Sequence, residues 1–100
     1  MKFYRLSPLA EADIEQIWRY TFENWSSAQA DRYIDDLFDA FELLADNPSM
    51  AQRGHGVTAG YRRYRVGHHL IFYKPAAGKG VEIIRILHEK SDMLRHLRFD

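Results

Sequence analysis

The chain has no cysteine, so disulfide bonds, thiolate catalysis and thiolate metal sites are excluded. It also lacks any apolar run near the roughly 20 residues that a membrane-spanning helix requires. The first five residues lack the apolar core of a secretory signal. These absences favour a cytoplasmic protein with no membrane partner.

The common catalytic motifs are missing as well. There is no Gly-x-Ser-x-Gly elbow and no phosphate-cradling glycine-rich loop, since Gly78-Lys79-Gly80 is typical of a hairpin turn. His68 and His69 are adjacent on an expected strand and therefore face opposite sides of it, so the histidines show no metal-ligand spacing. We expect neither a metal nor a cofactor.

General acid–base cleavage of RNA is the one enzymatic option that the residues leave open. It needs a group that titrates near neutrality and cations that stabilise the developing phosphorane charge. If the chain is a ribonuclease, the candidate catalytic residues are Arg63, His69 and Arg85, with His88 as a further source. Otherwise no catalytic residue is expected.

The length and composition describe one ordered domain. One hundred residues bury enough surface for one modest core, and 46% are hydrophobic and 14% aromatic. No long polar tract, internal repeat or low-complexity segment interrupts the sequence. We expect residues 1–100 to form a single domain.

The net charge of zero hides an uneven distribution. Residues 1–50 carry four Lys/Arg and ten Asp/Glu, whereas residues 51–100 carry ten Lys/Arg and four Asp/Glu. The net charges of the two halves are therefore −6 and +6. This asymmetry indicates either a basic surface that meets acidic peptide or phosphate, or two halves that attract each other.

The N-terminal half predicts a short strand followed by two helices. Residues 2–6 alternate as a strand would, and Ser7-Pro8 is typical of a helix start. Apolar residues then recur at helical spacing, with Asp13 expected to point outward. Ser26 resembles the N-cap of a second helix, which Asn47-Pro48 would end. Together they predict an antiparallel helix hairpin.

The C-terminal half predicts strands. Residues 49–59 are polar and are interpreted as a loop, and strands are expected at 61–66, 68–74 and 81–88. A last helical turn is expected at 92–97. The fold class is therefore α+β: a strand, an antiparallel helix hairpin, a three-stranded antiparallel meander and a short C-terminal helix.

Arg85 has two interpretations because it lies among apolar neighbours in the last strand. It can pair with a carboxylate from a helix or from the tail, for which Asp92 is a candidate. Alternatively it joins Tyr61, Arg63 and Arg65 in a patch that faces a ligand, since guanidinium groups suit phosphate and carboxylate alike. His88 is expected to close the last strand by bonding nearby backbone.

Aromatic residues on the helices form a possible stacking platform, but their helical spacing favours core packing. The residues concerned are Trp18, Phe22, Trp25 and Phe38. On the strands, Arg62 and Tyr64 face away from Arg63 and are expected to pack.

Several motifs, in order and spacing, resemble the ParE branch of the RelE/ParE toxin superfamily. The segment from Tyr4-Arg5-Leu6-Ser7-Pro8 to Trp18-Arg19-Tyr20-Thr21 is similar to the opening strand and first helix of that family. The later segments Gly60-Tyr61-Arg62, Val66-Gly67, Ile71-Phe72-Tyr73 and Glu82–His88 fall where the family has its strand motifs. The resemblance covers nearly the whole chain.

The resemblance implies the same α+β fold and a non-enzymatic toxin of a type II toxin–antitoxin system, of the kind linked to plasmid stabilisation. It implies inhibition of DNA gyrase by trapping it on cleaved DNA, so that nucleic acid is met only through partners. It also implies neutralisation by a ParD-like antitoxin. The antitoxin's tail would lie over the apolar groove beside the helices and send acidic residues toward Arg63, Arg65 or Arg85.

Two alternatives remain. The sibling RelE branch cleaves mRNA on the ribosome, but this chain has Glu89 and Leu94 where that branch favours an arginine and a tyrosine. A glutamate there would repel the scissile phosphate. The other alternative is a family member without toxicity that only binds its antitoxin as a co-repressor.

Overall fold

The computed structural model describes residues 3–53 and 60–91. Within these residues, two helices and five strands follow one another. They are β1 (Tyr4–Leu6), α1 (Pro8–Asn24), α2 (Ser27–Asp46), β2 (Gln52–Arg53), β3 (Arg62–Val66), β4 (His69–Pro75) and β5 (Val81–His88).

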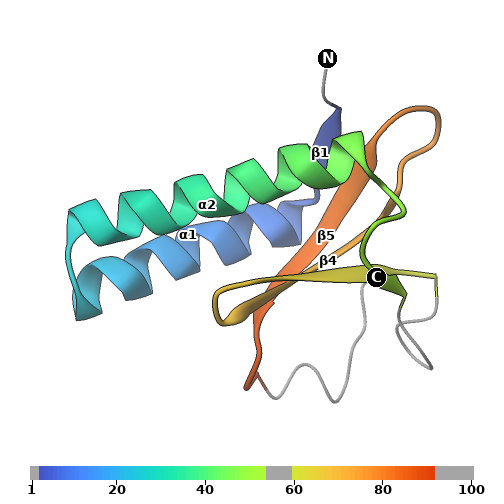
Figure 1. The fold of residues 1–100 in the computed structure, drawn as a ribbon. Coiled ribbons are helices and arrows are strands. Elements are labelled where there is room, and N and C mark those ends of the chain that lie inside the picture. The colour runs from blue at the N-terminus through green and yellow to red at the C-terminus, as the bar shows by residue number, and fades with distance from the viewer. Residues whose placement is uncertain (1–2, 54–59, 92–100) are drawn as a thin grey trace.

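The helices form an antiparallel hairpin that lies across one face of a five-stranded sheet (Figure 1). The strand order is β1-β5-β4-β3-β2, with β1 parallel to β5 and every other pair antiparallel. This arrangement confirms the expected α+β class, the helix hairpin and the meander. The expected C-terminal turn at 92–97 lies outside the described residues.

Both helices begin where the sequence predicts. The Ser7 hydroxyl oxygen accepts a hydrogen bond from the Ala10 N–H at 3.0 Å, and Pro8 occupies the first helical position. The Ser26 hydroxyl accepts from the Gln29 N–H at 3.0 Å in the same way. These serines satisfy N–H groups that have no partner inside the helix, and they define the two helix starts.

Strand β2 corrects the expectation of a loop at 49–59. Gln52 pairs with Arg63 and Arg53 with Arg62, which adds a fifth strand at the edge of the sheet. A two-residue edge strand of polar residues cannot be recognised from the sequence. It is defined by its pairing with a neighbouring strand and not by an alternating hydrophobic pattern. Arg62 holds this edge by donating to the carbonyl oxygen of Ala51 at 2.6 Å.

The core lies between the helix hairpin and the facing side of the sheet. Large side chains that are fully buried come from both layers, namely Leu37, Phe41, Leu44, Ile71, Tyr73, Val81 and Ile83. Tyr64 packs against this core, as expected for the side of β3 opposite Arg63. The Tyr73 hydroxyl donates to the Pro48 carbonyl at 3.0 Å, so its burial leaves no polar atom unpaired.

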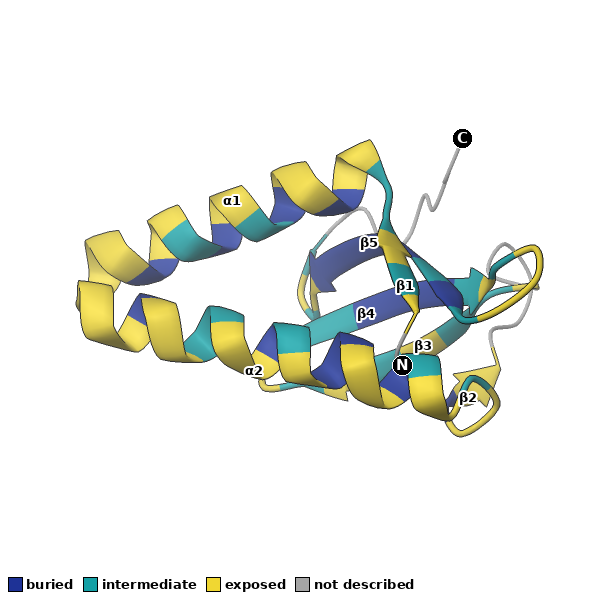
Figure 2. Ribbon diagram, turned by 90° about the horizontal axis from the view of Figure 1, so that it is seen from above, coloured by how far each residue is buried: buried dark blue, intermediate teal, exposed yellow. Residues whose placement is uncertain are grey.

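The far end of the helix hairpin projects past the sheet (Figures 1 and 2). Tyr20, Phe22 and Trp25 lie there and are 59%, 47% and 65% exposed. The expectation that Phe22 and Trp25 pack in the core is therefore wrong, whereas Phe38 does pack against it. Helical spacing fixed the face of α1 but gave no information on where the sheet beneath it ends.

None of the helices in the described part of the chain combines the length and the apolar character that spanning a bilayer requires.

Candidate functional site

Two adjoining hollows lie between α1 and the end of the sheet where β4 begins and β5 ends. Their volumes are about 450 Å³ and 320 Å³, and both are lined by Tyr20, His69 and His88. The larger one extends toward Asp13 and Arg85, and the smaller one toward Trp25 and Tyr33. Volumes of this size suit a side chain or a short segment of a partner.

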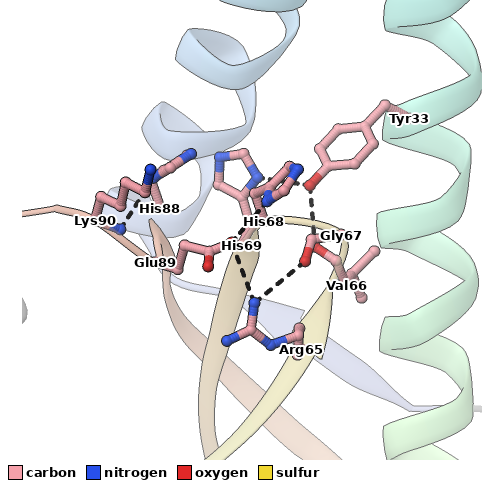
Figure 3. Close-up of polar contacts among 9 residues, drawn as sticks. All are labelled: Tyr33, Arg65, Val66, Gly67, His68, His69, His88, Glu89 and Lys90. Atoms are coloured by element: carbon pink, nitrogen blue, oxygen red, sulfur yellow. Dashed lines mark hydrogen bonds and ion pairs between the residues drawn. The ribbon is translucent and has the colours of Figure 1, made fainter.

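His69 is held by Tyr33 of α2 (Figure 3). The Tyr33 hydroxyl donates to the Val66 carbonyl at 3.0 Å and lies 2.6 Å from His69 Nδ1. A hydroxyl has one hydrogen, so if it is given to Val66, Nδ1 must carry the hydrogen that Tyr33 accepts. Nε2 of the neutral ring is then left as an acceptor.

His88 has the opposite tautomer. The backbone N–H of Lys90 donates to His88 Nδ1 at 3.0 Å, which confirms the expected bond to nearby backbone. Because Nδ1 accepts, the hydrogen of the neutral ring lies on Nε2. The rings of His69 and His88 meet edge to face with centroids 5.2 Å apart. The pair therefore brings an acceptor and a donor to the same place.

Glu89 accepts hydrogen bonds from two side chains beside this pair (Figure 3). Its Oε2 accepts from His68 Nδ1 at 2.7 Å and from Arg65 Nη1 at 3.2 Å. The hydrogen bonds from His68 and then Arg65 hold the pKa of Glu89 below its usual value. The positive charge of Arg65 is thus partly neutralised within the protein.

The pKa of His69 is lowered from 6.5 to about 4, first by burial and then by the neighbouring His88 and His68. The unfolded chain therefore binds a proton at this position below about pH 6.5, and the folded chain does so only near pH 4. Stability contributed by the neutral ring is present above pH 6.5 and is lost as the pH falls toward 4.

We expect this loss to be roughly 1–2 kcal/mol, about half of the full linkage value, because solvent screens a half-buried ring. Urea unfolding at pH 7, 5.5 and 4.5 measures it. His69→Gln should flatten the pH dependence, and His68→Gln, at a side chain that is 79% exposed, should flatten it much less, because His68 is the smallest of the three causes that lower the pKa of His69. Equal slopes for the wild type and His69→Gln would refute this assignment.

Arg85 pairs with a helix carboxylate, as one of its two interpretations predicts, but the partner is Asp13. Arg85 Nε donates to Asp13 Oδ2 at 2.8 Å and Nη2 to Oδ1 at 2.9 Å, and both side chains are 9% exposed. The bonds to Asp13 raise the pKa of Arg85 above its ordinary value. The expectation that Asp13 points outward is wrong, and Arg85 is not part of an exposed patch.

The structure does not bring Arg63, His69 and Arg85 together. Along β3, Arg63 and Arg65 are exposed and alternate with residues that pack toward the helices. His69 pairs with Val66, and therefore lies on the helix side, opposite to Arg63. Since Arg85 is paired and buried, these three residues cannot act jointly on one phosphate.

Metal binding receives no support from the geometry either. Within residues 3–53 and 60–91, no group of three His, Asp or Glu side chains is arranged to hold a metal ion.

Sequence reasoning missed the helix contribution to this site. Helical spacing places Tyr33 on the apolar face of α2 and predicts only packing, whereas its bond to His69 joins residues 36 positions apart. Its signal is weak, because a tyrosine among apolar residues is common in helices. Asp13 gave a clearer signal, since it falls between Ala10 and Ile17 on the buried stripe of α1.

The sequence matches known proteins over nearly its full length. Residues 4–93 match the family described as the ParE toxin of type II toxin–antitoxin systems, parDE. The chain is 42% identical over 97 residues to Toxin ParE1 of Caulobacter vibrioides, which covers 97% of this chain and 99% of the relative. Toxin ParE of Escherichia coli is 35% identical over 97 residues, covering 97% of this chain and 94% of the relative.

Solved structures share the fold at low sequence identity. A chain from the chromosomal ParDE system of P. aeruginosa has a TM-score of 0.73 at 17% identity, covering 88% of this chain and 96% of that one. A chain from the RelBE2 toxin–antitoxin complex of Mycobacterium tuberculosis has a TM-score of 0.65 at 19% identity, with coverage of 87% and 96%.

Proposed function

Because the chain belongs to the ParE toxin family of type II toxin–antitoxin systems, we propose that it inhibits DNA gyrase in the cytoplasm and is neutralised by a ParD-like antitoxin. The observation that carries the proposal is the 42% identity to a ParE1 toxin across 97% of the chain. Inhibition would proceed by trapping gyrase on cleaved DNA, so this protein needs no chemistry of its own.

The geometry of the site supports a non-enzymatic role. A ribonuclease needs free cations around the scissile phosphate. Here Glu89 pairs with Arg65 and accepts a hydrogen bond from His68, and Asp13 pairs with Arg85. His69 is neutral near pH 7 because its pKa is about 4, so it is a poor proton donor to a leaving group. Cleavage of mRNA is accordingly the weaker candidate.

Antitoxin binding is proposed to involve the exposed cations of β3. Arg63 is exposed and forms no ion pair within the described part of the chain, so it is available to an acidic residue of the partner. Arg65 is available only in exchange for Glu89. Arg85 is dropped from the proposed contacts, because reaching it would require breaking its buried bonds to Asp13.

The test is a supercoiling and cleavage assay with purified gyrase, titrated with this protein. We expect loss of supercoiling, accumulation of cleaved DNA, and reversal of both by the antitoxin encoded beside it. The matched control is heat-unfolded protein at the same concentration, since an unfolded basic segment can perturb DNA nonspecifically.

Other outcomes would redirect the assignment. Intact gyrase activity together with mRNA cleavage on ribosomes would replace the proposal with the RelE-type activity. Intact gyrase, intact mRNA and no growth arrest on expression would indicate a non-toxic partner of the antitoxin.

A further inference from the structure

The smaller hollow combines exposed aromatic rings with polar side chains. Tyr20 and Trp25 line it with ring centroids 6.1 Å apart, and they are 59% and 65% exposed. Since the core does not use these rings, their faces are available to a planar ligand. The polar part of the lining comes from Gln29, Tyr33, His68, His69 and His88.

Two ring nitrogens of the lining differ in their hydrogen-bonding role (Figure 3). The Tyr33 hydroxyl donates to the Val66 carbonyl and lies 2.6 Å from His69 Nδ1, which leaves Nε2 of the neutral His69 ring as an acceptor. His88 Nδ1 accepts from the Lys90 N–H at 3.0 Å, so its Nε2 carries a hydrogen and donates. The two rings have centroids 5.2 Å apart. A group that carries a donor next to an acceptor can therefore pair with both.

His68 adds an exposed polar ring beside this pair. Its side chain is 79% exposed, and its Nδ1 lies 2.7 Å from Glu89 Oε2, which also accepts from Arg65 at 3.2 Å. A carboxylate therefore accompanies the cations at this side of the hollow. An anionic group that entered would lose its hydration and meet this carboxylate. A neutral ligand suits the interior better, and any phosphate attached to it can stay in solvent.

We propose that this hollow binds one unstacked base of single-stranded DNA, which stacks on Tyr20 and Trp25 and bonds through its edge to His69 and His88. A base presents a flat face and a pairing edge with adjacent donor and acceptor groups. An apolar side chain in the same place would leave both ring nitrogens unpaired on burial. The choice of DNA rests on the proposed function, which places the chain at cleaved DNA, and the inference adds a direct contact with that DNA.

A single strand fits the site better than a duplex, because the bases of a duplex are stacked on each other and their pairing edges are occupied. Stacking on an aromatic side chain strengthens binding by about 5- to 150-fold per base, whichever base it is. The two hollows, of about 320 Å³ and 450 Å³, continue into each other at Tyr20, His69 and His88. The sugar attached to the base therefore has space beside it.

The test measures the affinity of the full chain for a labelled single strand of about 12 nucleotides by fluorescence anisotropy. The matched ligand is a strand of the same length that is abasic throughout, so it keeps every phosphate and loses every base. We expect the base-containing strand to bind at least about 10-fold more tightly than the abasic strand and than the duplex of the same sequence.

Substitutions locate the contact. Tyr20→Ala/Trp25→Ala should weaken binding of the base-containing strand about 10-fold or more and change binding of the abasic strand less than about 2-fold. Leu9→Ala, at a 42% exposed residue in the first turn of the same helix, should change neither. His88→Ala should weaken binding about 3- to 10-fold, and His88→Gln, which keeps a donor, should restore most of it. Circular dichroism and thermal melts check that each variant is folded.

Fluorescence gives an independent readout, because the chain has two tryptophans. In a Trp18→Phe background, Trp25 is the remaining indole. Its emission should be quenched by the base-containing strand, since a base stacks on the ring, and should not change with the abasic strand.

Other results would overturn the inference. Equal affinities for the base-containing and abasic strands, or no binding of either, would remove the base site. A folded Tyr20→Ala/Trp25→Ala variant with wild-type affinity would place the contact elsewhere. RNA of the same sequence that binds more than about 10-fold more tightly than the DNA would overturn the choice of DNA and favour the mRNA alternative. The gyrase titration is read separately, so its failure would remove the proposed function without changing the measured preference for bases.

Discussion

Replacing Asp13 with alanine is expected to lower the free energy of unfolding by about 3–5 kcal/mol, the cost of leaving one member of a buried ion pair without its partner. For a domain of this size the melting temperature would fall by roughly 15–25 °C. The effect is large because Asp13 holds three groups at once. Besides both bonds to Arg85, its Oδ2 accepts from the backbone N–H of Ile86 at 2.9 Å.

The position of Asp13 explains this triple role. β1 ends at Leu6, so β5 continues beyond Ile83 without a strand on that side in the described part of the chain. Residues at the start of α1 replace the missing strand. The Ser7 N–H donates to the Ile83 carbonyl at 2.9 Å, its hydroxyl donates to the Ile84 carbonyl at 2.7 Å, and Asp13 takes the next N–H. Removing the carboxylate takes away the hydrogen-bond acceptor of the Ile86 N–H. It also removes the charge that pairs with the buried guanidinium of Arg85.

Chemical denaturation and thermal melts at pH 7 measure the effect. Glu11→Ala, at an exposed acidic residue of the same helix, is the matched control and should cost less than 0.5 kcal/mol. The double variant Asp13→Leu/Arg85→Met should be more stable than Asp13→Ala, because no unpaired charge remains buried. A loss below 1 kcal/mol for Asp13→Ala would contradict the structural role.

Gly80→Ala is expected to be the second most damaging change and to lower the free energy of unfolding by about 2–4 kcal/mol. Gly80 has φ +83°, which already strains any other residue, and a Cβ there would overlap the carbonyl oxygen of Phe3. That carbonyl accepts from the Val81 N–H at 3.2 Å and continues the pairing of β1 with β5. The substitution therefore pushes the N-terminal strand off the sheet.

Gly78→Ala separates the two causes. Gly78 has a similar φ of +95°, but nothing lies within 4 Å of the added Cβ, so only the backbone strain of about 1 kcal/mol applies. Equilibrium unfolding in urea should rank wild type above Gly78→Ala above Gly80→Ala. If the two variants proved equally stable, the close approach of Phe3 would carry no energetic weight.

Local signals predicted much of the fold. Ser7-Pro8 and Ser26 cap helices through bonds to residues three positions away, so the sequence itself contains the whole motif. The strands of the meander were found for a similar reason, since alternation and the glycine turn at 78–80 are local. β2 was missed because two polar residues become a strand only by pairing with Arg62 and Arg63.

The candidate site was harder to predict, because it depends on where elements end. The exposure of Trp25 follows from α1 continuing past the sheet, and the burial of Asp13 follows from β1 stopping early. Neither the extent of α1 beyond the sheet nor the length of β1 can be read from the periodicity of a single helix. Strand alternation and the resemblance indicated Arg63, Arg65 and Arg85 together, yet Arg65 is paired with Glu89 and Arg85 with Asp13, both distant in sequence.

The parallel pairing of β1 with β5 bears on how this protein is made. Ser7 bonds to Ile84 across 77 positions of sequence and Asp13 to Arg85 across 72, so β1 and the start of α1 find their partner only after β5 has been synthesised. The helix hairpin can form while synthesis continues, but the sheet cannot close. Interrupted translation would therefore release chains that cannot complete the native sheet, and such chains are substrates for cellular proteases.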